Sequence, residues 1–476
     1  MNFMKYNTRF APSPTGKPHI GNIRTALFDY LAAKSSNGKF FLRIEDTDRE
    51  RFIPEAISNI HQALDWLGLK PDGDVVYQSS RVAIYQEKVQ ELLNNGSAYK
   101  CFCSKELLDE QRYKQEKEKK PPIYDRRCAD LTADVVDKKT ESGESFVVRF
   151  RIPKTPEEIS WVDKVRGKIT ISTNTLEDFI ILKSDGWPTY NLAHIIDDHE
   201  MNINLVIRGE EFVPSTPKYI LVYLAFGWEH PEYAHMPLTL GIDHKKLSKR
   251  NGDTAILDYK EKGYLPETMI NFLVLLGWNP GGGSTEEIYS LDILEKIFKI
   301  EDVNKSPAIF DIERLDWMNG LYIRNLPVDI LAKKLIEFNP IYLKNDRELL
   351  ERIVSVEQSR LKTLSAFDDI SNIYLVFPNY SPDLLIFKKS SPEPTKKGIE
   401  AVINDLVNLK WGSIADLEKT LARVVESYAL TNSDVYWPVR VALSGKDKSP
   451  SPSELLWVLG KDESLLRLKH ALNIIV

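Results

Sequence analysis

The chain has 476 residues, a formal net charge of −6, 42% hydrophobic residues and 28% charged residues. This composition is typical of a soluble globular protein of about three domains, and the acidic balance argues against a surface that binds nucleic acid all over. Three cysteines exclude a disulfide framework and favour a reducing, cytoplasmic location. No run of about 18 apolar residues is present, so we expect no membrane span.

The first part of the chain alternates between predicted strands and helices. Residues 8–11 predict a short buried strand and 39–46 predict a second one. Residues 21–36 and 54–68 carry apolar side chains at helical spacing. This alternation is typical of a doubly wound sheet of parallel strands.

The pattern changes near residue 100, where cysteines, the mixed-charge run QRYKQEKEKKPP and several prolines appear. We interpret this segment as an insertion that closes with strand-like FVVRFRIP and GKITIS. FIILKSDGWPTY then predicts a return to an apolar strand, LVIRGEEF at 205–212 a further strand, and PKYILVYLAFGW a helix. A lysine-rich loop follows, and the C-terminal half predicts amphipathic helices.

The loop PSPTGKPH leads directly from the first predicted strand into the first predicted helix. Free N–H groups and the positive end of the helix dipole form an anion site at such a junction. Gly21 lets a ligand approach the backbone closely, and His19 offers a donor to a phosphate under attack. An ordinary proline–glycine turn with a surface histidine would explain this string equally well.

A second motif, KKLSKRNG at 245–252, places Lys246 and Lys249 three residues apart. A loop of this kind can close on a triphosphate and neutralise the charge that grows as pyrophosphate leaves. Taken alone, a solvated basic loop is the simpler interpretation. The two motifs together are much more specific.

These motifs resemble known signatures. HIGN and KLSKR resemble the HIGH and KMSKS sequences of class I aminoacyl-tRNA synthetases. RFAPSPTG, FLRIEDTDRER, DFIILKSDGWPTYNLAHIIDDH and VIRGEE are similar, in order and spacing, to successive blocks of bacterial-type glutamyl-tRNA synthetase, and the similarity continues into WPVRVALSG at 437–445. The departures are Asn22 in HIGN and Leu247, which replaces the signature methionine.

The resemblance implies a fold of the class α/β plus all-α. A class I Rossmann-type catalytic domain would carry an inserted acceptor-binding domain and be followed by a helical half. The expected boundaries are 1–98 and 178–240 for the two halves of the catalytic domain, 99–177 for the inserted acceptor-stem-binding domain, 241–325 for the stem-contact domain with the KLSKR loop, and 326–476 for the α-helical anticodon-binding domain.

The implied activity is that of a glutamate–tRNA ligase. ATP, with Mg²⁺, would activate L-glutamate to glutamyl-adenylate, and the glutamyl group would pass to the 3′ end of tRNA-Glu; tRNA-Gln stays open as a second substrate. The resemblance also implies a monomer that does not associate with a membrane. One alternative is a glutaminyl-tRNA synthetase, which resembles RFPPEPNG where this chain has RFAPSPTG and ends in β-barrels. The other is a non-catalytic tRNA-binding paralogue, which the presence of His19 and Lys249 disfavours.

The same resemblance implies the site residues. His19 and Lys249 are the expected catalytic residues, and the expected ATP contacts are His19, Gly21, Lys246, Lys249 and Glu211. The expected glutamate contacts are Arg9, Ser13, Glu45, Tyr190, Asn191 and Arg208, with Glu45 as the partner of the ammonium. Arginine suits such a substrate because its guanidinium donates two parallel hydrogen bonds to a carboxylate. Without the resemblance, a structural ion pair is the simpler interpretation of Arg9 or Glu45.

All three cysteines, Cys101, Cys103 and Cys128, fall in the predicted insertion. Some bacterial glutamyl-tRNA synthetases carry a zinc site of the form CxC…CxH there, so the resemblance implies a structural Zn²⁺. The histidine position is Asp130 in this chain, and aspartate can bind zinc. Tyr124 is the rival for the fourth ligand, and three reduced cysteines without a metal are the alternative to both.

Overall fold

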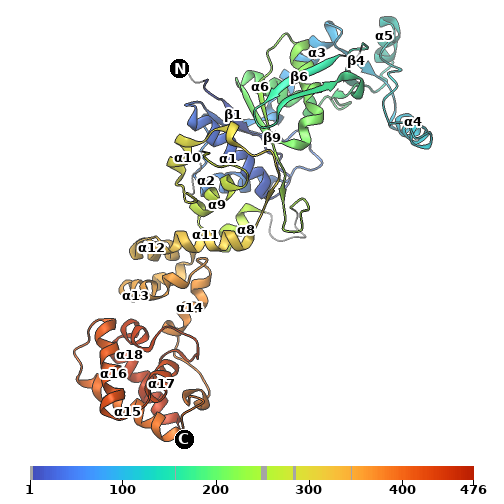
Figure 1. Cartoon of the computed structure of the whole chain (residues 1–476). Coiled ribbons are helices and arrows are strands. Elements are labelled where there is room, and N and C mark those ends of the chain that lie inside the picture. The colour runs from blue at the N-terminus through green and yellow to red at the C-terminus, as the bar shows by residue number, and fades with distance from the viewer. Residues whose placement is uncertain (1–3, 156, 248–254, 282–285, 345, 476) are drawn as a thin grey trace. The chain divides into compact units, whose positions relative to one another are not determined.

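The computed structural model describes residues 4–155, 157–247, 255–281, 286–344 and 346–475. The chain forms two compact units, the first made of residues 1–259 and 269–311 and the second of residues 260–268 and 312–476 (Figure 1). This division falls between the starts of the two C-terminal domains expected from the sequence, at residues 241 and 326, and those boundaries remain predictions.

Two sheets with parallel strands lie next to each other at the centre of the first unit. β1 (Thr8–Phe10) pairs in parallel with β2 (Phe40–Ile44), which pairs with β3 (Val76–Tyr77). β9 (Leu205–Gly209) begins beside β1, where its first amide donates to the Asn7 carbonyl at 3.4 Å, and pairs in parallel with β10 (Glu232–Met236). The sheet of β1 to β3 and the sheet that holds β9 and β10 are therefore neighbours at β1 and β9 and extend in opposite directions from there, and doubly wound folds bind ligands at such a switch point.

The helices beside these sheets begin and end where the local sequence predicts. α1 (Ile20–Ser35) starts after its N-cap His19 and packs against β1 and β9, which buries most of its apolar residues. α2 (Pro54–Leu67) has proline in its first turn and ends at Gly68, whose φ of 71° glycine adopts without strain. The predicted strands and helices of this region are thus confirmed. Further elements up to residue 311 are α3 (Val82–Asn94), α6 (Tyr190–Glu200), α7 (Thr216–Ala225), α8 (Ile256–Glu261), α9 (Pro266–Leu275), α10 (Leu291–Ile297), β11 (Thr239–Leu240) and β12 (Ala308–Ile309).

The predicted insertion contributes to two different sheets. β4 (Ala98–Cys101), β5 (Val147–Phe150) and β8 (Ile180–Leu182) form an antiparallel sheet of their own. The hairpin of β6 (Glu158–Asp163) and β7 (Gly167–Ser172) instead joins the sheet of β9 and β10, where β6 pairs with β10. Residues 99–177 therefore do not form one sheet of their own, because their hairpin belongs to the sheet of β9 and β10.

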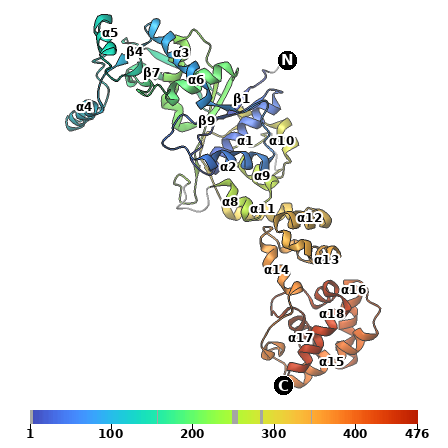
Figure 2. The same cartoon turned by 180° about the vertical axis from the view of Figure 1, so that it is seen from behind.

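Two helices of the insertion lie outside the sheets. α4 (Lys105–Lys117) and α5 (Ala133–Glu141) are on the side away from α1 and α2 in both Figures 1 and 2. Neither helix contains a buried residue. The mixed-charge run forms the end of α4, as its composition predicts.

Two predicted strands are shorter than their apolar patterns suggest. In FIILKSDGWPTY only residues 180–182 are in a strand, because the chain then turns back: the Lys183 amide donates to the Trp187 carbonyl at 2.8 Å. Tyr190 already begins α6. In LVIRGEEF the strand ends at Gly209, and a 3₁₀ turn over 210–215 follows.

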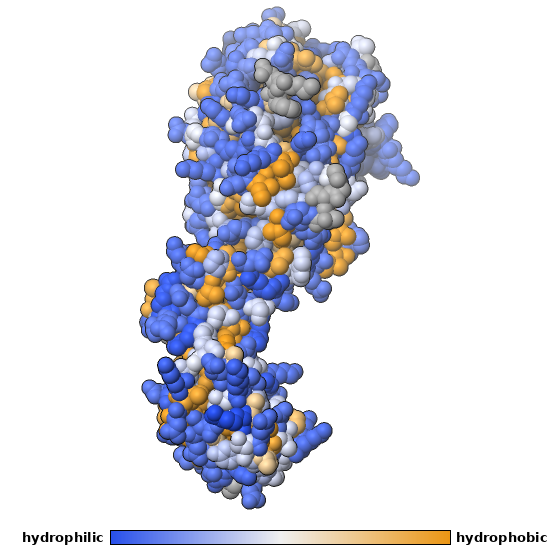
Figure 3. Space-filling view, turned by 60° about the vertical axis from the view of Figure 1, so that its left-hand side comes forward, coloured by the Kyte–Doolittle hydropathy of each residue, from blue (hydrophilic) through white to orange (hydrophobic). Residues whose placement is uncertain are grey.

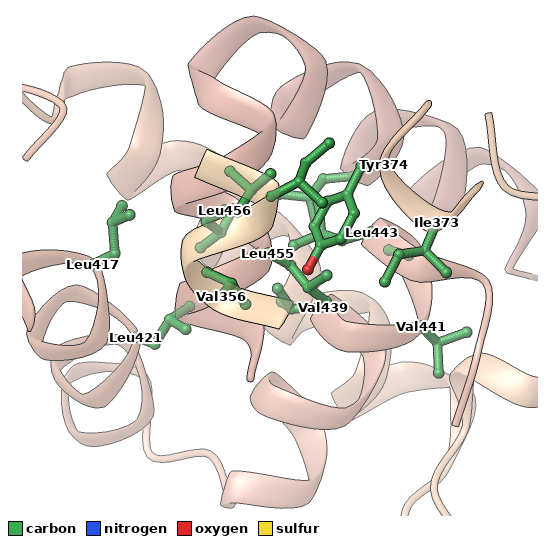
Figure 4. Close-up of a cluster of buried hydrophobic side chains, with 14 of the residues drawn as sticks. Val356, Ile373, Tyr374, Leu417, Leu421, Val439, Val441, Leu443, Leu455 and Leu456 are labelled. Atoms are coloured by element: carbon green, nitrogen blue, oxygen red, sulfur yellow. The ribbon is translucent and has the colours of Figure 1, made fainter. Parts of the chain in front are cut away.

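The second unit is helical, as predicted, and has its own core. Figure 4 shows part of that core, in which Leu455 and Leu456 lie with Val439, Leu443 and Tyr374. Its helices are α11 (Ile312–Arg324), α12 (Val328–Phe338), α13 (Arg347–Glu357), α14 (Ala366–Leu375), α15 (Pro392–Asn408), α16 (Ile414–Ser427), α17 (Asn432–Ser444) and α18 (Pro452–Ile474). Capping boxes at Ser413, Thr431 and Ser451 set the starts of the last three helices.

The surface is mainly polar where it can be seen. On the face drawn in Figure 3, hydrophilic side chains predominate and apolar ones form small separate groups. Among the described residues, no helix combines the length and the apolar character that a membrane crossing requires.

Candidate active site

A cavity of about 470 Å³ opens at the carboxyl ends of the central strands, where the two sheets are neighbours. Of the predicted site residues, those that line it are Arg9, Ser13, His19, Gly21, Glu45, Tyr190, Arg208, Glu211 and Lys246. Asn191 is not among the lining residues; its Nδ2 lies 3.5 Å from the Ile180 carbonyl. Lys249 lies outside the described residues.

His19 and Gly21 form one side of the cavity. His19 Nδ1 accepts a hydrogen bond from the Gly21 amide at 3.0 Å, so a neutral ring carries its proton on Nε2. A Cβ at position 21 would lie 3.3 Å from this Nδ1, and glycine therefore leaves room for the histidine ring. A helix N-terminus and an N–H donor, both of which stabilise anionic oxygen, are brought together here.

The start of the lysine motif forms a turn at the edge of the same cavity. Leu240 and Lys246 form an antiparallel bridge, and the Leu247 amide donates to the Thr239 carbonyl at 3.2 Å. Lys246 and Leu247 line the cavity, with Lys246 exposed and Leu247 buried. The turn thus places one basic side chain of the motif opposite the start of α1.

Arg9 and Glu45 take part in a buried ion network. Arg9 Nε donates to Asp198 Oδ1 at 2.9 Å, and Arg43 bonds both Asp198 at 2.6 Å and Glu45 at 3.0 Å. Burial raises the pKa of Glu45, against the opposing effect of Arg43 and Arg9. Arg9 and Glu45 therefore combine both interpretations. Each one forms a buried ion pair, Arg9 with Asp198 and Glu45 with Arg43, and each one also lines the cavity.

Arg208 is held in a different way. Its Nε donates to His235 Nε2 at 3.1 Å and its Nη2 to Thr216 Oγ1 at 2.7 Å, while Nη1 has no partner among the described residues. The residue is 5% exposed, and its guanidinium lies about 5 Å from the ring centres of Phe212, Tyr219 and Tyr233. A buried cation with a spare donor is suited to bind an anion.

Aromatic and acidic residues complete the wall. Tyr190 stacks on His194 with ring centres 4.3 Å apart, and burial raises the pKa of its phenol. The Glu211 carboxylate occupies the space that a Cβ at Gly209 would fill. Any larger residue at position 209 would displace that carboxylate.

The sequence analysis missed three charged residues that line the cavity, Arg24, Asp29 and Arg51, of which Arg24 and Asp29 are buried. Both are in α1 and nearly fully buried. Both oxygens of Asp29, and Nε and Nη2 of Arg24, have no hydrogen-bond partner among the described residues. Burial raises the pKa of Asp29 well above its ordinary value and lowers that of Arg24 to about 10. The sequence carries a signal for Arg24 and Asp29, because these two charged residues flank the run TALF in a helix that is expected to be buried.

The three cysteines come together in the predicted insertion. Their sulfur atoms all lie within 4.8 Å of one another, and the Cys103 and Cys128 sulfurs are 3.6 Å apart. Four tetrahedral ligands about 2.3 Å from a zinc ion would be separated by similar distances. A hydrogen bond from Cys128 lowers the pKa of the Cys101 thiol, whereas burial raises the pKa of the Cys103 thiol, so Cys101 is the one that forms the metal-binding thiolate more readily.

The two candidates for a fourth ligand lie in different places. Tyr124 Oη is 3.2 Å from Cys101 Sγ and 3.6 Å from Cys103 Sγ. The Asp130 carboxylate instead lies 3.1 Å from Lys154 Nζ, is mostly exposed, and is not grouped with the thiols. The structure therefore brings Tyr124 to the thiols and does not bring Asp130 there.

Known protein families agree with this geometry. A family model described as tRNA synthetases class I (E and Q), catalytic domain, matches residues 5–317, and one described as anticodon binding domain matches residues 330–472. The chain is 40% identical over 473 residues to a glutamate–tRNA ligase of Clostridium acetobutylicum, with 97% of each chain covered. It is 42% identical to one of Clostridium botulinum, with 99% of each covered.

A solved structure shows the same fold. The crystal structure of a glutamate tRNA ligase from Elizabethkingia meningosepticum, in complex with its amino acid, matches 99% of this chain and 100% of that chain, with a TM-score of 0.91 and 33% identity. Fold and cavity thus define a class I tRNA synthetase of the glutamate and glutamine group. The chain belongs to the glutamate–tRNA ligases, a family of aminoacyl-tRNA ligases. The family and fold class predicted from the sequence are confirmed.

Proposed function

We propose that this chain activates L-glutamate with ATP and transfers the glutamyl group to the 3′ end of tRNA-Glu. One observation carries the proposal: a single cavity is lined by the buried Arg9 and Arg208 with Glu45, and also by a helix N-terminus with His19 and Lys246. The first group suits an amino acid with two carboxylates, and the second group suits a triphosphate.

Glutamate would be held by charge matching. Arg9 and Arg208 would each take one of its carboxylates, and Glu45 would take the ammonium. Ser13, Tyr190 and Asn191 remain predicted contacts. Glutamine would leave one arginine without a charged partner, and mismatches of this kind discriminate on the order of 10⁴-fold or more.

ATP would bind with its phosphates at the start of α1. The His19 Nε2–H and the α1 N-terminus would stabilise the α-phosphate as the glutamate carboxylate attacks it. Lys246, Lys249 and Glu211 remain predicted ATP contacts, and the lysines would neutralise the departing pyrophosphate. Magnesium, arriving with ATP, would supply further neutralisation of phosphate charge.

The helical second unit supports tRNA as the second substrate. Its residues 330–472 match the anticodon-binding family model. We propose a cytoplasmic monomer as the working form, in keeping with three reduced thiols held next to one another.

Aminoacylation tests this function directly. The purified protein should attach radiolabelled glutamate to tRNA-Glu, and it should attach no glutamine under the same conditions. A tRNA-Gln transcript assayed alongside shows whether that tRNA is a second substrate. If no glutamate is attached to either transcript or to the fully modified tRNAs, the proposed function is wrong.

We also propose that Cys101, Cys103, Cys128 and Tyr124 hold a structural Zn²⁺. The protein should retain about one zinc ion after dialysis against a weak chelator, as counted by mass spectrometry. Cys128→Ser should abolish retention, because a thiolate ligand is lost, and Tyr124→Phe should weaken it. Asp130→Asn is the matched control and should leave the zinc content unchanged. Loss of zinc in Asp130→Asn, with retention in Tyr124→Phe, would instead assign the fourth position to Asp130.

A further inference from the structure

The orientation of Arg208 depends on two buried residues that no part of the proposed mechanism uses. His235 and Asp163 are 0% and 1% exposed, and His235 Nδ1 lies 2.5 Å from Asp163 Oδ2. His235 Nε2, on the other side of the ring, lies 3.1 Å from Arg208 Nε. Asp163, His235 and Arg208 therefore form a continuous chain of hydrogen bonds that ends at the cavity.

The sheet that holds β9 and β10 sets this chain of residues. Asp163 is the last residue of β6, His235 is in β10 and Arg208 is in β9. The three strands are neighbours in the order β6–β10–β9, and His235 is the direct register partner of Arg208. Strand pairing thus places His235 directly beside Arg208. Asp163, whose register partner is Tyr233, lies two residues away along β10, and its side chain reaches His235.

The chemistry of Asp163 fixes the tautomer of His235. Asp163 Oδ1 already accepts hydrogen bonds from the amides of Val165, Arg166 and His235, at 3.0–3.2 Å. Although burial opposes ionisation, the hydrogen bond from His235 helps to lower the pKa of Asp163, which remains a carboxylate and can only accept. The proton on His235 must then lie on Nδ1, which leaves Nε2 as an acceptor.

A neutral His235 with Nε2 unprotonated is what Arg208 requires. Arg208 Nε–H can only donate, so a proton on His235 Nε2 would set two donors against each other. Burial lowers the pKa of His235 and keeps the ring neutral. Thr216 Oγ1 accepts from Arg208 Nη2 at 2.7 Å and lies 3.2 Å from His235 Nε2 and 3.0 Å from the Phe212 carbonyl, so its single proton can go to either of the last two. An unprotonated His235 Nε2 is compatible with both arrangements.

We propose that His235, oriented and held in its Nδ1–H tautomer by Asp163, is a positioning residue that fixes the Arg208 guanidinium so that Nη1 meets a carboxylate of the substrate. The inference rests on the proposed function, in which Arg208 binds glutamate. It adds two residues, one of them from the predicted insertion, to the machinery that selects the amino acid.

Two substitutions of His235 separate its two hydrogen bonds. His235→Gln places an amide oxygen near the Nε2 position and keeps the acceptor for Arg208. His235→Asn keeps a donor for Asp163 and removes that acceptor. His235→Asn should raise KM for glutamate on the order of 10- to 100-fold, with KM for ATP within about twofold of the wild-type value. His235→Gln should recover most of this loss, which a general packing role would not allow.

Asp163→Asn provides the matching test from the other end. An amide donor at this position would shift the histidine proton to Nε2, so glutamate KM should rise as in His235→Asn.

Nitrogen NMR of the wild-type protein labelled at histidine should show His235 Nε2 unprotonated, and this measurement needs no folded variant. A protonated Nε2, or equal rises in KM for glutamate and ATP in His235→Asn, would overturn the proposal. If the wild-type protein charges no tRNA with glutamate, the proposed function is overturned instead. If the wild-type protein charges tRNA but His235→Asn has an unchanged KM for glutamate, only the positioning role of His235 is overturned.

Discussion

Arg208→Met should lower kcat/KM for glutamate by roughly 30- to 5,000-fold, equivalent to about 2–5 kcal/mol. The guanidinium is buried, and its Nη1 has no partner among the described residues. A bound carboxylate would therefore lose a charge-assisted hydrogen bond in a site from which water is largely excluded. Steady-state aminoacylation with glutamate as the varied substrate measures this loss.

Arg208→Lys is the matched control for charge. Lysine keeps the positive charge but cannot donate to His235, Thr216 and a substrate carboxylate at once. We expect an intermediate loss of kcat/KM, with the KM for ATP nearly unchanged in both variants. An Arg208→Met enzyme with wild-type kcat/KM for glutamate would remove Arg208 from the glutamate site.

Arg43→Met should destabilise the fold by about 3–5 kcal/mol, because it breaks a buried ion network on one side only. Arg43 is fully buried and bonds Glu45 at 3.0 Å and Asp198 at 2.6 Å. Its removal leaves Glu45 without its partner and Asp198 with Arg9 alone. Calorimetry of the full chain should show the lower melting temperature.

The same variant should become more sensitive to acid. Arg43 and Arg9 lower the pKa of Asp198 to about 2, despite its burial. A carboxyl whose pKa is lower in the folded state stabilises the fold above its unfolded pKa, near 3.8, and this stabilisation is lost as the pH falls toward 2. Without Arg43 the pKa of Asp198 rises, so acid unfolding should begin at a higher pH.

Arg51→Met is the surface control for this experiment. Arg51 pairs with Asp48, and both side chains are largely exposed. Exposed pairs contribute about 0–1 kcal/mol, so the melting temperature should hardly change. Equal effects of Arg43→Met and Arg51→Met would contradict the assignment of the buried network as a stabilising element.

The sequence by itself determined the local features of this protein. Proline and glycine positions marked the loop before α1, apolar periodicity marked α1 and α2, and short strings such as HIGN and KLSKR marked the family. Each of these signals depends on residues close together in the chain, where backbone preference and side-chain periodicity act directly. Nine predicted site residues were accordingly found around one cavity.

Only the tertiary structure decided which distant groups meet. The sequence analysis placed Asp130 beside the thiols as the fourth metal ligand, with Tyr124 as its rival, whereas folding brings Tyr124 there and pairs Asp130 with Lys154. The sequence likewise does not show which residues hold the side chains that line the cavity. Asp198 is the hydrogen-bond partner of Arg9, and His235 is that of Arg208. Their contacts come from strand order and burial, which join residues far apart in the chain and leave no local pattern.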